Sequence, residues 1–254
     1  METIWDKIYQ DYAKGKVHPA LESDDILGDF RSFVETSAFS VKSALEIGCG
    51  RGRYLQYLEG LGFTVSGIDS SSTAISLSKT IMSTKAKLDV EDMFRYDIPK
   101  NQFDLVFSIA TIHHGKKEEV NNLIHRMISG CRENGKIFIT LPIYPEKGLS
   151  QSLYKKIINQ IMRFVSEGLP NIGGFKTLKR DLCNRNWDAW KYMGNGVTLP
   201  LSGREKGLFH SYYKREELDK VFSGCLEYTI ERNSESWIIK ATTRGQARPN
   251  SGLN

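Results

Sequence analysis

The chain of 254 residues is 40% hydrophobic, 26% charged and 11% aromatic, a composition that excludes disordered and fibrous proteins. Its length predicts one large α/β domain, or one domain with an elaborated insertion. No apolar run approaches the ~18 residues that cross a bilayer, and residues 1–6 lack the basic start of a secretion signal. We therefore expect a cytoplasmic protein that neither spans a membrane nor is exported.

Cysteine spacing and charge distribution narrow the function classes further. The four cysteines lie tens of residues apart with no CxxC pair or Cys/His cluster, so the sequence predicts neither a disulfide framework nor a zinc site, and we expect no metal. The net charge of +5 is concentrated in residues 151–220, which hold 13 Lys and Arg against 7 Asp and Glu, a balance of +6. This segment carries the positive field of the chain.

From Ser43 to Leu141 the sequence alternates short apolar runs, turns and amphipathic stretches, which is the pattern of βαβ units. The expected strands are residues 44–47, 63–68, 87–90, 103–109 and 136–141. The expected helices are residues 54–61, a segment capped by Ser71 or Ser72 that runs to residue 81, and residues 120–131. Short connections through helices predict a parallel, doubly wound sheet, in which ligands bind beyond the carboxyl ends of the strands.

The pattern changes after Pro142. We place an insertion at residues 143–210 and interpret it as a lid for acceptor recognition. Within this insertion an amphipathic helix is expected over residues 153–165, and residues 171–210 are predicted to be irregular. A helix over 216–222 and an antiparallel pair of strands, 228–230 with 237–239, complete an expected sheet of seven strands. The expected organisation is a cap over residues 1–42, a core over 43–142, the insertion over 143–210, the end of the core over 211–242, and a disordered tail over 243–254.

A glycine cluster between the first strand and the first helix is the strongest functional signal. Gly48, Gly50 and Gly52 allow the backbone to approach a ligand closely. Asp69 closes the second strand, at the distance expected of an acid that accepts hydrogen bonds from ribose hydroxyls. The nicotinamide-binding fingerprint requires glycine where this chain has Arg53, so a dehydrogenase is disfavoured.

The segment Leu45–Tyr54 resembles the loop of the class I S-adenosylmethionine-dependent methyltransferases (type 11/25-like domain), in which E/D-x-G-x-G-x-G wraps the amino-acid end of the cofactor. Residues 67–71, 91–93 and 103–108 match further motifs of that family, and residues 131–136 resemble the turn before its fifth strand without the proline and first glycine. The resemblance implies a Rossmann-like fold, methyltransferase activity and S-adenosylmethionine as cofactor. The residues it assigns to cofactor binding are Glu46, Gly48, Gly50, Gly52, Asp69, Ser70, Asp92, Met93 and Ile109.

Three histidines are candidates for catalysis. His113 and His114 follow the fourth strand, at the end of the sheet where the reacting methyl group is expected, and His210 lies in a segment expected to fold back over the pocket. Each is able to accept a proton from a hydroxyl acceptor. The alternative is that these side chains pack and bond the loop backbone.

Several other side chains admit two interpretations, ligand contact or plain packing and solvation. Glu46 either meets the cofactor's amino group through a water or holds the loop by bonding backbone N–H groups. The remaining candidates are Trp5, Tyr9 and Tyr12 as a cover over the cofactor, Arg51 and Arg53 near its carboxylate, and Trp187, Trp190 and Tyr192 against an aromatic acceptor.

The expected activity is methyl transfer to the nitrogen, oxygen or sulfur of a small molecule held under residues 143–210. One alternative is an RNA methyltransferase of the tRNA wobble uridine type, suggested by the +6 segment with its interleaved aromatic residues. Another is a non-catalytic, cofactor-binding partner subunit. The amphipathic helix is equally suited to a dimer interface, so the sequence leaves monomer and homodimer open.

Overall fold

The structure, a computed structural model, describes residues 3–15, 26–144, 190–201, 205–234 and 236–244. The helix predicted over 153–165, most of the predicted insertion and Trp187 lie outside these residues. None of the described helices combines the length and apolar character that a membrane span requires. Three of the four cysteines, Cys49, Cys131 and Cys225, are described, and all three are buried free thiols.

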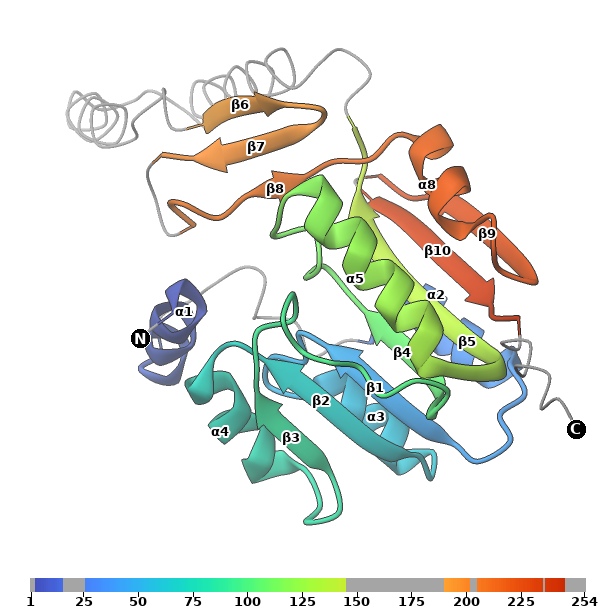
Figure 1. The fold of residues 1–254 in the computed structure, drawn as a ribbon. Coiled ribbons are helices and arrows are strands. Elements are labelled where there is room, and N and C mark those ends of the chain that lie inside the picture. The colour runs from blue at the N-terminus through green and yellow to red at the C-terminus, as the bar shows by residue number, and fades with distance from the viewer. Residues whose placement is uncertain (1–2, 16–25, 145–189, 202–204, 235, 245–254) are drawn as a thin grey trace, which may run out of the picture.

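A seven-stranded sheet forms the centre of the molecule, in the order β3-β2-β1-β4-β5-β10-β9 (Figure 1). Its five N-terminal strands are parallel, whereas β10 runs antiparallel to both β5 and β9. The strands are β1 (Ser43–Ile47), β2 (Thr64–Asp69), β3 (Lys87–Val90), β4 (Phe103–Ser108), β5 (Cys131–Pro142), β9 (Glu227–Arg232) and β10 (Ser236–Thr242). The predicted doubly wound, mostly parallel sheet is confirmed.

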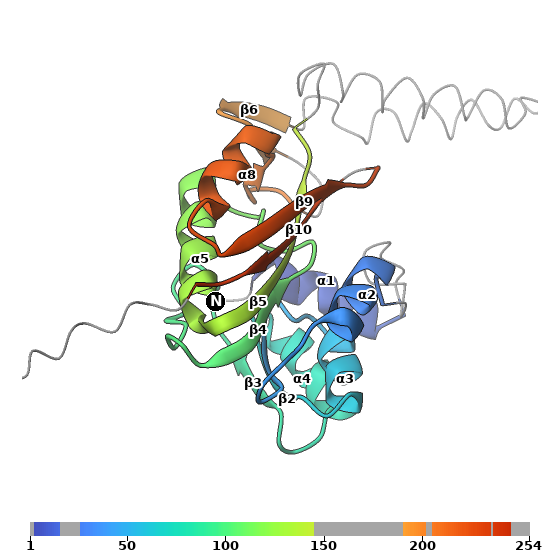
Figure 2. The same cartoon turned by 90° about the vertical axis from the view of Figure 1, so that its right-hand side faces the viewer.

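Helices cover both faces of this sheet, with α5 and α8 on one face and α2, α3 and α4 on the other (Figure 2). The helices are α1 (Ile4–Ala13), α2 (Gly28–Thr36), α3 (Arg53–Gly60), α4 (Ser72–Ile81), α5 (Lys117–Gly130) and α8 (Arg215–Phe222). Alternation along each strand divides the apolar side chains between the two faces. In β4, Val106 packs with the α5 side, while Leu105 and Phe107 pack with the α3 side.

The segment that was predicted to turn before the fifth strand belongs to β5 itself. Phe103 pairs with Cys131 and Leu105 with Lys136, so the register shifts here, and Asn134 takes a positive φ of 60°. The prediction of a separate turn was therefore wrong. A bulge of this kind lets a strand begin early and still follow its neighbour.

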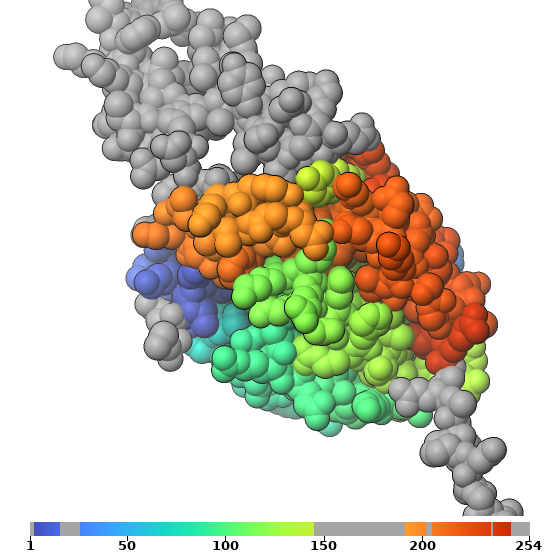
Figure 3. Space-filling view, turned by 45° about the horizontal axis from the view of Figure 1, so that its top comes forward, coloured from blue at the N-terminus to red at the C-terminus, as the bar shows by residue number. Residues whose placement is uncertain are grey.

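Residues 190–211 also differ from the prediction, because part of this segment is regular. Three short strands form a second antiparallel sheet: β6 (Trp190–Gly194), β7 (Val197–Pro200) and β8 (His210–Ser211). Asn195 and Gly196 join β6 to β7 with φ values of 46° and 73°, as a tight hairpin turn requires. The expectation of irregular backbone over 171–210 is thus wrong for these strands, which lie next to α5 and α1 on the surface in Figure 3.

Thr243, where the expected disordered tail begins, is held against the sheet. Thr243 is buried; its amide donates to the Gly135 carbonyl at 2.9 Å, and its hydroxyl donates to the Arg132 carbonyl at 2.6 Å. These bonds fix the end of β10 against β5. Residues 245–254 lie outside the described part of the chain.

Candidate active site

A pocket of about 400 Å³ opens at the carboxyl ends of β1, β2 and β4, the edge of the sheet where ligands were expected. The loops after these strands supply its floor, and α1 supplies one wall. Eight of the nine residues that the resemblance assigned to cofactor binding line it: Glu46, Gly48, Gly50, Asp69, Ser70, Asp92, Met93 and Ile109. Gly52 does not line it.

At Gly48 and Gly50 the loop between β1 and α3 brings main chain without a side chain to the pocket. A Cβ at Gly48 would lie 2.1 Å from Thr111 Cγ2, and one at Gly50 would lie 2.3 Å from the Tyr9 hydroxyl. Both residues have positive φ angles, 75° and 53°, which residues other than glycine rarely adopt. Gly52 is the N-cap residue of α3, and a Cβ there would instead lie 2.2 Å from Ser78 Oγ of α4, so its role is close packing of the two helices.

Asp69 holds the glycine loop and the start of α4 together. Its Oδ2 accepts from the Gly50 amide at 2.9 Å and its Oδ1 from the Ser71 amide at 2.9 Å, while Ser71 caps α4 as predicted. Burial raises the pKa of Asp69, and these two N–H donors oppose that rise. Each carboxylate oxygen has a second acceptor site. The side chain is therefore able to hold the loop and accept from a ligand hydroxyl at once.

Glu46 is a buried acid on β1 whose Oε2 atom has no hydrogen-bond partner among the described residues. Burial raises its pKa well above the usual value, Arg53 lowers it and Asp69 raises it further. An unsatisfied buried carboxylate is costly. A ligand with a positive donor group would satisfy it, which favours the interpretation of Glu46 as a ligand contact.

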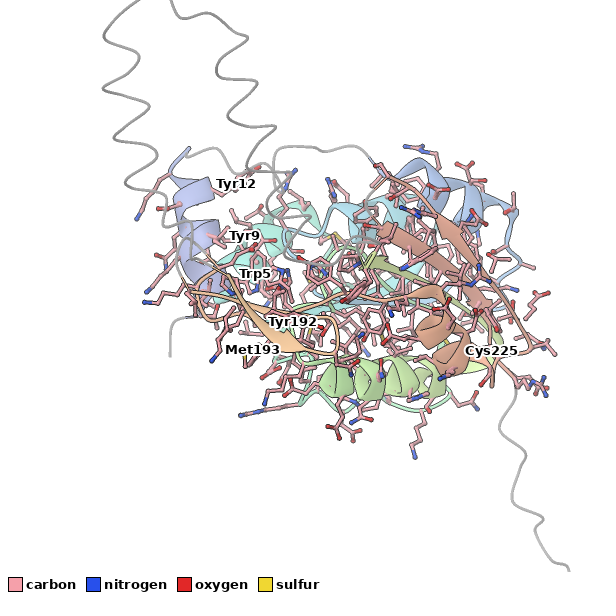
Figure 4. All side chains as sticks on the ribbon, turned by 90° about the horizontal axis from the view of Figure 1, so that it is seen from above. Trp5, Tyr9, Tyr12, Tyr192, Met193 and Cys225 are labelled. Carbon is pink, nitrogen blue, oxygen red and sulfur yellow. The ribbon has the colours of Figure 1, made fainter. Side chains whose placement is uncertain are left out.

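The N-terminal helix covers the glycine loop. Trp5 and Tyr9 line the pocket, and Figure 4 shows them with Tyr12 on the side of α1 that faces the sheet. Burial raises the pKa of the Tyr9 hydroxyl, so it stays protonated. Asp6, which the sequence analysis did not single out, accepts hydrogen bonds from Ser71 and thereby ties α1 to α4.

The side of the pocket formed by the segment after β3 is more open. Asp92 lines it with a half-exposed side chain, and its Oδ1 accepts from the Phe94 amide at 2.9 Å. Arg51 and Arg53 also line the pocket; their guanidinium groups lie over Tyr12 at 5.5 Å and Tyr54 at 4.8 Å. Both cations are therefore close enough to meet an anionic ligand group.

The three candidate histidines converge at one end of the pocket. His114 lines it, and the rings of His113 and His210 lie behind, 4.0 Å and 4.6 Å from the His114 ring. Burial lowers the pKa of His113 to about 3 and that of His114 to about 2, with His210 contributing to both shifts and His113 to that of His114. Both rings are therefore neutral near pH 7.

The candidate acceptor-stacking residues of the insertion are not brought to the pocket. Tyr192 lies on β6 with 54% of its surface exposed and does not line the pocket (Figure 4). Trp187 is outside the described residues, and only the backbone of Trp190 is described. Stacking by these residues stays a prediction.

The described residues fit the cofactor that the sequence resemblance implies. Because Gly48 and Gly50 have no side chains, the cofactor can approach the main chain of this loop closely. Asp69 is placed for hydroxyl groups, and the partnerless oxygen of Glu46 is placed for an ammonium group.

Comparison with known proteins also indicates a methyltransferase domain. Residues 44–135 match the model of a family described as methyltransferase domain. An uncharacterized methyltransferase of Staphylococcus carnosus (strain TM300) is 32% identical over 126 residues, and the phosphoethanolamine N-methyltransferase of Plasmodium falciparum (isolate 3D7) is 28% identical over 119 residues. These matches cover 49% and 46% of this chain but only 59% and 45% of the two relatives.

Among solved structures, the fold resembles a methyltransferase of Burkholderia thailandensis with bound 1,6-didemethyltoxoflavin and S-adenosylhomocysteine, which acts on N1 of that compound. The TM-score is 0.57, and the match covers 95% of this chain and 88% of that one. The sequences are 10% identical, so this likeness is evidence for the fold alone.

Proposed function

We propose that residues 44–135, which match the methyltransferase domain family, form a class I S-adenosylmethionine-dependent methyltransferase domain, and that the protein transfers the methyl group of S-adenosylmethionine to a small-molecule acceptor. The observation that carries the proposal is the pocket itself, in which the bare glycine loop meets two buried acids, Glu46 and Asp69. A non-catalytic subunit that had lost use of the cofactor need not have kept this combination.

The residues of this chain would divide the work of binding between them. Glu46 would accept from the amino group of the cofactor, Asp69 from its ribose hydroxyls, and Asp92 from its adenine amino group. The bound cofactor supplies an electrophilic methyl group on a sulfonium centre. The protein's remaining task is alignment of the acceptor, which is worth ~7–11 kcal/mol of barrier in favourable cases.

The acceptor is expected at the end of the pocket that His114 and Trp5 form, because the other end is taken by the residues assigned to the cofactor. Trp5 packs edge-on against the His114 ring, with centroids 5.0 Å apart, and excludes water there. His114 Nδ1 is buried with no hydrogen-bond partner among the described residues, so it is available to accept a hydrogen bond from a hydroxyl group of the acceptor. A small molecule suits an end that α1 encloses.

Calorimetric titration with S-adenosylmethionine and S-adenosylhomocysteine tests the cofactor step. We expect micromolar binding, lost in Asp69→Ala and weakened at least tenfold in Asp69→Asn, whose amide keeps the acceptor for one loop N–H. Asp219→Asn on α8, remote from the pocket, is the matched control. Absence of binding to both ligands would overturn the proposal.

The acceptor step is tested by release of S-adenosylhomocysteine on incubation with pools of metabolites and, separately, with tRNA. Turnover with amines, hydroxy compounds or thiols is the expected result. Turnover with tRNA alone would replace the small-molecule acceptor by RNA.

A further inference from the structure

Three histidines distant in sequence form one compact cluster beside the pocket. The ring centroids of His113 and His114 are 4.0 Å apart, those of His114 and His210 are 4.6 Å apart, and those of His113 and His210 are 5.6 Å apart. One ring nitrogen of each histidine lies within 4.8 Å of the corresponding nitrogens of the other two. The cluster is the one group of three or more His, Cys, Asp or Glu side chains with this spacing in the described part of the chain.

Two of these rings carry buried polar atoms with nothing to bond. Nδ1 of His113 and Nδ1 of His114 have no hydrogen-bond partner among the described residues. His114 and His210 are 8% and 7% exposed, so water reaches them poorly. Buried ring nitrogens normally have a hydrogen-bond partner. Because these two have none among the described residues, we expect a ligand to bind them.

Backbone hydrogen bonds fix the two chain segments that carry the cluster. The Ser211 amide in β8 donates to the His113 carbonyl at 2.9 Å, and the Ser211 hydroxyl donates to the Gly115 carbonyl at 2.7 Å. The His114 amide donates to the Thr111 carbonyl at 3.1 Å. The histidines are thus held together by the fold itself, as a metal site requires.

We propose that His113, His114 and His210 bind a divalent transition metal ion, for which zinc is the best match. Imidazole nitrogens are preferred ligands of zinc, and three histidines leave one tetrahedral position open. Zinc–nitrogen bonds of about 2.0–2.1 Å separate tetrahedral ligand atoms by roughly 3.4 Å. The ring nitrogens, which lie within 4.8 Å of one another, would therefore have to move closer by up to about 1.4 Å when the ion binds.

Glu205 supplies the carboxylate that commonly accompanies a metal-binding histidine. Its Oε2 atom lies 3.3 Å from Nε2 of His210. With an ion bound, a carboxylate in this position would hold the orientation of the ring and leave the other nitrogen, Nδ1, for the metal. Glu205 is thus a positioning residue and not a ligand.

The site would also change how an acceptor is deprotonated, a role that rests on the proposed methyltransferase function. A bound metal ion would occupy ring nitrogens that are themselves too weakly basic to take a proton from an acceptor near pH 7. The acceptor's hydroxyl or thiol would then bind at the open position as an anion, with its proton released to solvent. Metal binding itself does not depend on methyl transfer.

Titration of the chelator-stripped full-length protein with zinc chloride, in competition with a chromophoric chelator, tests the site. We expect one zinc ion per chain, and at least 100-fold weaker binding in His113→Ala, His114→Ala and His210→Ala. His125→Ala removes an exposed histidine of α5 and is the matched control, with unchanged affinity. Glu205→Gln is expected to weaken binding by about 10–100-fold.

Two further measurements separate loss of the site from loss of the fold. Thermal unfolding should shift upward with zinc for the wild type and His125→Ala but not for the cluster variants. Cobalt(II) should give the intense visible bands of a four-coordinate site in the same two proteins alone. Zinc binding that is absent from the wild type, or unchanged in all three cluster variants, overturns the proposal, whatever the calorimetry with S-adenosylmethionine gives.

Discussion

The Asp6 carboxylate in α1 accepts a hydrogen bond from the Ser71 hydroxyl over 2.8 Å, and this contact joins α1 to the start of α4. The same Oδ1 atom accepts from the Thr73 amide at 3.2 Å, and Oδ2 accepts from the Thr3 amide at 3.2 Å. One carboxylate thus satisfies donors at the N-termini of two helices, where negative charge is favourable. The wall of the pocket that carries Trp5 and Tyr9 is fixed through this side chain.

Asp6→Ala is therefore expected to weaken both folding and cofactor binding. Loss of these hydrogen bonds should lower the free energy of unfolding by about 1–3 kcal/mol. Binding of S-adenosylhomocysteine should weaken as well, because α1 covers the glycine loop. Urea unfolding and calorimetry measure the two effects. As a control, Asp219→Ala removes an exposed ion pair with Arg215 and should change the free energy of unfolding by no more than about 0.5 kcal/mol. Wild-type affinity for S-adenosylhomocysteine in Asp6→Ala would show that α1 does not enclose the bound cofactor.

Glu46→Gln should separate stability from binding. Burial raises the pKa of Glu46, so the folded state resists its ionisation, and stability falls as pH rises from the usual glutamate pKa towards the raised one. The side-chain amide that replaces the carboxyl group does not ionise, so the variant does not lose stability in this way. We expect its free energy of unfolding at pH 7 to exceed that of the wild type by about 1–3 kcal/mol.

The same substitution should weaken S-adenosylmethionine binding at least tenfold, because the charge opposite the amino group is lost. Denaturant unfolding across pH 4–8 and calorimetry at pH 7 are the measurements. Glu118→Gln, at an exposed acid of α5, is the control. A Glu46→Gln protein that is less stable than the wild type at pH 7 would contradict the description of Glu46 as an unsatisfied buried acid.

Gly50→Ala tests the close approach between α1 and the glycine loop. The new Cβ would lie 2.3 Å from the Tyr9 hydroxyl, at a positive φ of 53°, so we expect loss of cofactor binding and of stability. Tyr9→Phe in the same chain removes the clashing oxygen and leaves Tyr9 Cζ at 3.4 Å, an ordinary contact.

The double variant should therefore be more stable than Gly50→Ala alone. A double-mutant cycle based on urea unfolding measures this difference. Gly60→Ala, where a Cβ meets nothing within 4 Å, should be neutral or stabilising. Strict additivity of Tyr9→Phe and Gly50→Ala would show that the two residues do not clash.

The sequence predicts the features whose signals are local. The apolar run of β4 and the spacing from Gly48 to Asp69 fall within short windows, and the structure confirms the strands and brings these residues to one pocket. The hairpin of β6 and β7 was missed although Asn195–Gly196 is a strong type I′ signal, because the flanking strands show little hydrophobic alternation.

The sequence predicted that the segment of His210 folds back over the pocket, but it did not predict the individual long-range contacts. Asp6 meets Ser71 across 65 positions, and the link from Ser211 to Gly115 that brings His210 to His114 spans 96 positions. No periodicity or motif encodes such a pairing. The absence of a zinc site was predicted from cysteine spacing, which carries no information on the proposed site because its ligands would be three histidines on two separate segments.

Asp104 gives a pH-dependent test of the sheet itself. Its Oδ2 atom accepts from the Ser43 amide at 3.0 Å and the Ser43 hydroxyl at 2.9 Å, and Arg132 lies 3.5 Å away, so β4 is tied to the start of β1. Burial opposes ionisation, but the Ser43 donors and Arg132 hold the pKa of Asp104 below its usual value. The stability that this carboxylate contributes is therefore complete above its unfolded pKa of about 3.9 and is lost as pH falls through the lowered value.

Asp104→Ala should lower the free energy of unfolding by about 1–3 kcal/mol at pH 7, because the Ser43 amide loses its acceptor. The gap between variant and wild type should narrow as pH falls below about 3.9. Urea unfolding at pH 7, 4 and 3 measures this. Asp29→Ala removes a carboxylate 3.9 Å from Lys240 at the surface and should cost less than about 1 kcal/mol throughout. Curves for Asp104→Ala and the wild type that stay parallel down to pH 3 would mean that the folded state leaves the Asp104 pKa unchanged.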